Sequence, residues 1–132
     1  MKKIFLILLL IAINSCTDNF TEKEVIGYYV PIGYKNTFDT IQLMQGEKYH
    51  RKVYDKNKKL VLDMIGNYKL LDNGSKIDFH SYFLNLDRDL EKFPELVKDT
   101  NFGAELSLER IKNTIQFCTG YEIYSNCYQK LK

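Results

Sequence analysis

The chain contains no Trp, only two Pro and three Cys, and it has almost no excess of either charge. Nineteen basic residues stand against seventeen acidic ones, a net charge of +2 that is too small to indicate a nucleic-acid-binding protein. Hydrophobic residues at 45% and charged residues at 27% are ordinary for a folded protein, so a wholly disordered chain is not expected. A length of 132 residues suits a single domain.

Motifs that identify enzymes and metal sites are also missing. The sequence has no glycine-rich phosphate loop, no His-rich cluster and no pair of Glu residues in a glycosidase context. Ser81 lacks flanking glycines, so it does not match the nucleophile of a Gly-x-Ser-x-Gly elbow. We therefore expect no cofactor and no metal.

The first feature that is present is a short apolar run behind a basic start. Lys2 and Lys3 precede ten consecutive apolar residues, 4–13. A transmembrane helix needs about 20 apolar residues, so this run is about half as long as a membrane span. Its length and its basic start are typical of a signal peptide.

The residues that follow, Ile13-Asn14-Ser15-Cys16, resemble the bacterial lipobox, in which an aliphatic and a small residue precede an invariant Cys. The resemblance implies that residues 1–15 are a cleaved signal peptide and that Cys16 carries acyl chains such as palmitate. Acyl chains would anchor the protein in the bacterial cell envelope, with the outer membrane as the expected location. Residues 16–24 would then be the lipidated Cys and a polar tether. The alternatives are an ordinary secretory signal with a chance Cys and a buried N-terminal strand.

The rest of the sequence alternates polar and apolar residues in short segments. Removing residues 1–15 also removes Lys2 and Lys3, which leaves a domain without formal net charge. Asp72-Asn73-Gly74 is the strongest hairpin signal. Turn signals at intervals of 8–12 residues predict an antiparallel barrel or sandwich. The candidate strands are residues 25–32, 38–45, 48–54, 60–71, 75–84, 105–110, 114–118 and 121–131.

One segment breaks this alternation. Leu86, Leu90, Phe93 and Val97 recur at helical spacing, and Pro94 fits best at the first position of a second helical turn. We expect one broken helix or two short helices near residues 87–99. This segment would either cover the open end of a barrel or fill core surface.

Two of the candidate strands share a Gly placed two residues before a Tyr: Gly27 before Tyr29, and Gly66 before Tyr68. Gly in a strand permits a close backbone approach, and an aromatic side chain can cover the gap. The pattern resembles the strand starts of small lipocalin-like domains in bacterial lipoproteins. Over residues 25–132, the resemblance implies a mainly β fold, an up-and-down antiparallel barrel of about eight strands.

Cys118 and Cys127 remain once Cys16 is assigned to the lipid anchor. An exported protein can form a disulfide between them. If Thr119-Gly120 is the turn, Cys127 lies too far along its strand for a direct bond. A wider loop around residues 121–124, or another strand, would bring the two together; the alternative is two separate thiols.

Both histidines, His50 and His80, fall on the polar face of a predicted strand. Asp78 lies two residues before His80 on the same face, which is the nearest approach to an acid–base pair. Solvated surface histidines are the simpler interpretation. We therefore expect no enzyme, and a small enzyme that uses Asp78 and His80 is the least favoured hypothesis.

Residues 48–59 are the most basic part of the domain, and within them Tyr49, Arg51, Lys52 and Tyr54 form a candidate binding surface. Aromatic residues among basic ones suit a polyanion or anionic head groups, although a solvated hairpin is the usual explanation. Residues 87–99 carry five acids and three bases, and this separation of charge could guide a protein partner.

These features predict a monomeric, lipid-anchored envelope lipoprotein with a non-catalytic binding domain and no nucleic-acid partner. The ligand is either a small apolar or envelope-derived molecule or a protein, as for a hydrolase inhibitor or an immunity-type protein. The binding role rests on analogy between folds. A continuous apolar cavity in the barrel would favour the small ligand, and a filled interior with exposed Tyr would favour the protein partner. His80 paired with a carboxylate in a cleft would favour an enzyme.

Overall fold

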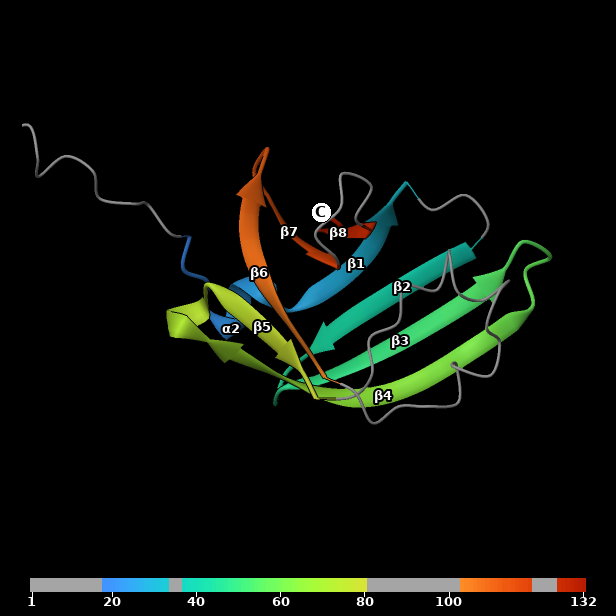
Figure 1. Ribbon diagram of the computed structural model, residues 1–132, viewed down its shortest axis with the longest axis horizontal. Helices are drawn as coiled ribbons and strands as arrows, with labels where there is room; N and C mark the ends of the chain where they lie inside the picture. The colour runs from blue at the N-terminus through green and yellow to red at the C-terminus, as the bar shows by residue number, and fades with distance from the viewer. Residues whose placement is uncertain (1–17, 34–36, 81–102, 120–125) are drawn as a thin grey trace, which may run out of the picture.

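The computed structural model describes residues 18–33, 37–80, 103–119 and 126–132. Eight strands form a closed barrel in which each strand pairs antiparallel with the next, and β8 pairs with β1 (Figure 1). This confirms the predicted up-and-down barrel. The strands are β1 (Gly27–Ile32), β2 (Thr37–Met44), β3 (Lys48–Asp55), β4 (Leu60–Leu71), β5 (Lys76–Phe79), β6 (Ala104–Ile111), β7 (Thr114–Thr119) and β8 (Asn126–Lys130).

The strand boundaries follow the alternating pattern closely. Strand β4 spans the predicted residues 60–71. Strands β2 and β6 each differ from the predicted range by one residue at both ends, and β3 and β7 by one residue at the C-terminal end only. The predicted strands 75–84 and 121–131 are seen as β5 and β8, but residues 81–84 and 121–125 lie outside the described residues. The helical segment expected at 87–99 also lies outside them. Within the described part of the chain, no helix is long and apolar enough to cross a membrane.

Aromatic side chains line the barrel interior. Period-two alternation turns one face of each strand inward, and the inward residues include four Tyr and two Phe that are at most 1% exposed. Five of these rings pack in pairs with centroids 5.0 to 5.6 Å apart, at the separations that aromatic pairs prefer; they belong to Tyr29, Tyr49, Phe79, Phe117 and Tyr128. The six are Tyr29, Tyr49, Tyr68, Phe79, Phe117 and Tyr128.

The N-terminal segment covers one end of the barrel, which we call the α2 end. A short helix, α2 (Glu22–Val25), begins with a capping box in which the Thr21 backbone N–H donates to Glu24 Oε2 over 2.9 Å. Phe20 is 3% exposed and Val25 is fully buried, so both belong to the core. Phe20 therefore docks on the barrel, within the segment 16–24 that was expected to be a polar tether. The polar sequence around Phe20 concealed this docking.

The turn between β4 and β5 shows why a glycine is required where this segment crosses the barrel. The predicted hairpin signal forms the turn η1 (Asp72–Gly74), in which Asp72, Asn73 and Gly74 have φ of 50°, 57° and 87°. A Cβ at Gly74 would lie 1.8 Å from the carbonyl oxygen of Phe20. The Phe20 N–H instead donates to the Gly74 carbonyl over 3.2 Å, which fixes the segment on the turn.

The paired Gly pattern of β1 and β4 also has a packing explanation. Tyr49 lies opposite Gly66 in the β3–β4 register, and a Cβ at Gly66 would lie 2.5 Å from the Tyr49 ring. The aromatic ring therefore covers the glycine, as the sequence indicated. At Gly27 the covering group is instead the aliphatic stem of Lys130, whose Cε would lie 2.7 Å from a Cβ.

Candidate functional site

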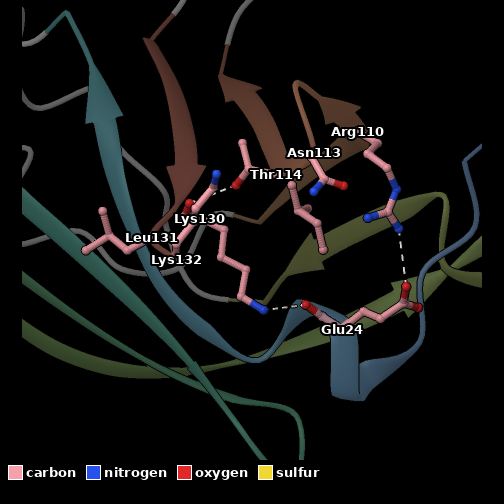
Figure 2. A pocket seen from close by; sticks show the side chains of 8 residues that line it. Glu24, Arg110, Asn113, Thr114, Lys130, Leu131 and Lys132 are labelled. Carbon is pink, nitrogen blue, oxygen red and sulfur yellow. Dashed lines mark hydrogen bonds and ion pairs between the residues drawn. The ribbon is translucent and has the colours of Figure 1, made fainter.

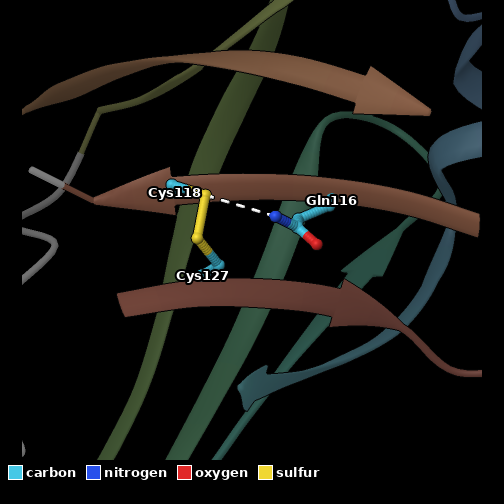
Figure 3. Close-up of a disulfide and its surroundings, with 3 residues drawn as sticks. All are labelled: Gln116, Cys118 and Cys127. Carbon is cyan, nitrogen blue, oxygen red and sulfur yellow. Dashed lines mark hydrogen bonds between the residues drawn. A yellow bond between two sulfur atoms is a disulfide. The ribbon is translucent and has the colours of Figure 1, made fainter. Parts of the chain in front are cut away.

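Cys118 and Cys127 form a disulfide that joins β7 to β8 (Figure 3). They are direct partners in the strand register, and Gln116 Nε2 donates to Cys118 Sγ over 3.4 Å. Strand β7 ends at Thr119 and β8 begins at Asn126, so the connection is wider than a Thr119-Gly120 turn. The wider loop considered from the sequence is therefore correct. A structural disulfide indicates an extracytoplasmic location.

The candidate surface of Tyr49, Arg51, Lys52 and Tyr54 is divided by its own strand. Tyr49 and Arg51 point into the barrel and are fully buried, whereas Lys52 and Tyr54 lie on the outer face and are partly exposed. The four residues therefore do not form one surface, because successive side chains of a strand point to opposite sides.

Arg51 takes part in a buried polar cluster that the sequence analysis missed. Its Nε and Nη2 donate to the two carboxylate oxygens of Asp39, at 3.1 and 2.5 Å. Tyr128 OH donates to Asp39 Oδ2 over 2.5 Å and accepts from Arg51 Nη2 over 2.9 Å. Period-two alternation places Asp39 on the same face of β2 as the buried Ile41, so a signal for this inward position was present in the sequence. The cluster links β2, β3 and β8 and is sealed from solvent.

Each histidine lies near a carboxylate on the outside of the barrel. His50 on β3 and Asp63 on β4 are 2.5 Å apart, and the hydrogen bond from His50 lowers the pKa of Asp63. His80 Nε2 is 3.8 Å from Asp78 Oδ2, which is beyond hydrogen-bond distance, and His80 is exposed. The Asp78 and His80 enzyme hypothesis gains no support from this geometry. The expectation of a non-enzyme stays a prediction.

Three neighbouring strands carry a row of apolar residues that are at least partly exposed to solvent. In the strand register Phe38 lies opposite Tyr54, and Tyr54 lies opposite Leu60 across a register shift between Val53 and Tyr54. Phe38 is 58% exposed and Leu60 is 43% exposed. We call these three residues the outer row. They meet at the far end of the barrel, opposite α2, and the sequence analysis had identified only Tyr54.

Lysines border the outer row on the side of β3 and the β3–β4 turn. Lys52 lies on the same face of β3 as Tyr54, and Lys56, Lys58 and Lys59 lie exposed in the turn between β3 and β4. The Asp55 Oδ1 atom already accepts hydrogen bonds within that turn, from the backbone N–H groups of Asn57 and Lys59 over 2.8 and 2.9 Å. We call these four lysines the lysine rim.

A pocket of about 320 Å³ lies at the α2 end, between α2, the β6–β7 turn and the end of β8 (Figure 2). Glu24 binds basic groups on two sides: its Oε1 accepts from Arg110 Nη2 over 3.2 Å, and its backbone carbonyl accepts from Lys130 Nζ over 2.5 Å. The hydrogen bond from the Thr21 backbone is the largest cause that lowers the pKa of Glu24. Burial lowers the pKa of Lys130, partly offset by the charge of Glu24.

Comparison of the chain with family models, with curated proteins and with solved structures finds no match. Within the described ranges, no group of three or more His, Cys, Asp or Glu residues is arranged to hold a metal ion. The fold and its sites therefore define the class: a small, disulfide-containing antiparallel β-barrel domain, consistent with a binding domain.

Proposed function

We propose that the protein is a lipid-anchored lipoprotein of the bacterial cell envelope whose barrel binds a protein partner on its outer surface, without catalysis. One observation carries the binding role. Aromatic side chains occupy the barrel interior, whereas Phe38 and Leu60 are exposed to solvent in a row with Tyr54. Burying such a row is favourable, and aromatic residues are common at the centres of interfaces.

The anchor is supported by the lipobox resemblance, and the position of Asp18 indicates how an anchored barrel would be oriented. Asp18 Oδ2 accepts from the backbone N–H of Arg110 over 2.8 Å, which fixes Asp18 beside the β6–β7 turn. Two extended residues span at most about 7 Å. An acylated Cys16 would therefore hold the α2 end close to the membrane, and the outer row at the far end would face away from it.

The lysine rim indicates the chemistry of the partner. Lys52, Lys56, Lys58 and Lys59 border the apolar row on one side, while the Asp55 carboxylate is hydrogen-bonded within its own turn and that of Asp63 to His50. An apolar contact with an acidic border fits this surface best. A hydrolase inhibitor or an immunity-type protein would bind in this manner.

The anchor is tested by fractionating cells that produce the wild-type chain or its Cys16→Ser form. We expect the wild type in the membrane fraction, and the variant unprocessed or soluble, because it lacks the acylated thiol. Equal membrane retention of the two proteins would contradict acylation at Cys16.

The partner is tested by replacing Tyr54 with a photoreactive aromatic residue in intact cells and identifying the cross-linked proteins. We expect an acidic protein whose cross-link is lost in a Phe38→Ser background and kept in an Ile111→Ser background. Ile111 is 37% exposed and lies at the α2 end, so it controls for the loss of an exposed apolar side chain. Recovery of lipid alone, or equal loss in both backgrounds, would contradict a protein partner on the outer row.

A further inference from the structure

The pocket at the α2 end has an excess of positive charge. Arg110, Lys130 and Lys132 line it together with one acidic side chain, Glu24 (Figure 2). Three positive charges and one negative charge leave the lining side chains with a formal charge of +2. The Asp18 carboxylate, which accepts from the Arg110 backbone N–H over 2.8 Å, lowers the local excess, and a bound anion would offset what remains.

The position of Lys130 depends on a glycine in the neighbouring strand. Its stem crosses β1 at Gly27, where a Cβ would lie 2.7 Å from Lys130 Cε. The ammonium then reaches the Glu24 carbonyl over 2.5 Å, while Thr114 Oγ1 donates to the Lys130 carbonyl over 2.8 Å. An ammonium has three N–H donors. In the described part of the chain Lys130 Nζ makes this one hydrogen bond, so two donors are left for a ligand.

Arg110 is held in place by the N-terminal segment. Its guanidinium lies over the Phe20 ring, 4.9 Å from the centroid, and its Nη2 donates to Glu24 Oε1 over 3.2 Å. A guanidinium has five N–H donors in a planar fork that matches the oxygens of a phosphate or a carboxylate. Arg110 thus offers a fixed fork, and Lys130 offers a point charge on another wall of the same pocket.

We propose that this pocket binds a phosphate group. A phosphate monoester carries a charge of about −1.5 to −2 at neutral pH and has three acceptor oxygens, which matches the charge and the donors of the pocket. A volume of about 320 Å³ is at the small end for ligand sites, so it suits a phosphate with a short polar substituent. The source of that phosphate depends on the proposed anchor. If Cys16 is acylated, the pocket lies at the level of the lipid headgroups and a headgroup supplies the phosphate. If it is not, the ligand is a soluble phosphate ester.

Titration of the full chain carrying Cys16→Ser with glycerol 3-phosphate tests the site, with binding followed by NMR shifts of the backbone amides. We expect saturable shifts at residues 110–114 and 130–132, and affinity about tenfold or more lower in Arg110→Gln and in Lys130→Gln. Lys132→Gln is a third variant, in which we also expect a lower affinity. Because Lys132 is exposed, its replacement leaves the core intact. The control is Lys58→Gln, the same charge change in the exposed turn at the far end. Absence of saturable shifts, or equal weakening by Lys58→Gln, would overturn the proposal.

Vesicles separate the two sources of phosphate. Retention of the Cys16→Ser chain on phosphatidylcholine vesicles that contain phosphatidic acid, lost in Arg110→Gln, would support a headgroup ligand. Glycerol 3-phosphate binding without vesicle retention would support a soluble phosphate ester. If Cys16 is not acylated, the fractionation of the wild-type protein shows it, and the affinity for glycerol 3-phosphate is unchanged. The proposed anchor and the proposed phosphate site can therefore be disproved independently.

Discussion

Asp39, Arg51 and Tyr128 place a bidentate ion pair and a hydroxyl among the aromatic side chains of the core. Removing two charges from water is costly, and their attraction offsets that cost only when the hydrogen-bond geometry is good. Here the Asp39 carboxylate accepts hydrogen bonds from both other residues. Because the three residues come from β2, β3 and β8, we infer that the cluster favours one strand register over its alternatives.

Removing one partner of this pair is expected to destabilise the barrel strongly. Asp39→Ala leaves the Arg51 charge buried without its carboxylate, so we expect a loss of about 3–5 kcal/mol in the free energy of unfolding, measured by urea denaturation. The control is Asp63→Ala, which breaks the exposed pair with His50 and should cost much less, because exposed ion pairs contribute little to stability. Asp39→Leu combined with Arg51→Met should cost less than Asp39→Ala. Equal losses for Asp39→Ala and Asp63→Ala would contradict a buried, coupled pair.

Gly74 provides a test of how the N-terminal segment is docked. Gly74→Ala meets both a positive φ and the Phe20 carbonyl, whereas Gly46→Ala meets a positive φ of 77° with nothing within 4 Å. We expect about 1–3 kcal/mol of backbone strain in each variant. In Gly74→Ala alone we expect a further loss in the free energy of unfolding, together with faster proteolysis near residues 18–25. Similar proteolysis of the two variants would indicate that the segment does not depend on this contact.

Tyr68 gives the barrel a pH dependence at the alkaline end. Burial is the main cause that raises the pKa of Tyr68 from 10.0 to about 12, and the charges of Glu22 and Glu47 contribute to the rise. The unfolded chain therefore loses its phenolic proton first, and stability falls as pH rises from 10 to 12. Urea unfolding at a series of pH values should show a smaller decline for Tyr68→Phe than for the wild type. Parallel declines would show that Tyr68 is not the group responsible.

At the scale of elements, the disulfide stabilises the pairing of β7 and β8. The two cysteines are nine positions apart, and closing a loop of this size contributes about 2.5–3 kcal/mol in the chain-entropy model. Replacing both Cys118 and Cys127 by Ala should lower the free energy of unfolding by about this amount. Adding a reductant should lower the wild type to a similar value and leave the double variant unchanged. If the reductant also lowered the free energy of unfolding of the double variant, the loss in the wild type would have a cause other than the disulfide.

The strands were predictable from sequence because a barrel with one buried face imposes strict alternation over eight segments. Helix α2 was not, because four residues are too few to show a helical period and Phe20 is the one large apolar residue in a polar segment. Arg51 shows a different failure. Its position in the alternation placed it inside with Tyr49, but its charge suggested the surface.

The candidate sites were harder to predict because they depend on register across distant segments. The outer row needs the pairing of Phe38 with Tyr54 and of Tyr54 with Leu60, and the hairpin signals do not specify that register. The pocket joins Glu24 to Arg110 and Lys130, which are 86 and 106 positions away along the chain. Only closure of the barrel brings these residues together.

At the scale of the whole molecule, the two ends of the barrel carry different surfaces. The α2 end holds the N-terminal segment and a pocket with excess positive charge, while the far end carries the exposed outer row with its lysine rim. The arrangement suits a protein attached at one end that presents the other. The outer row would then be accessible to a partner beyond the membrane surface.

The most direct test of this arrangement is mass spectrometry of the N-terminal peptide from protein isolated from its native membrane. We predict that the mature chain begins at Cys16 and that this residue carries the added mass of acyl chains. A chain that retains residues 1–15, or one that carries an unmodified Cys16, would contradict the lipid anchor and the orientation derived from it.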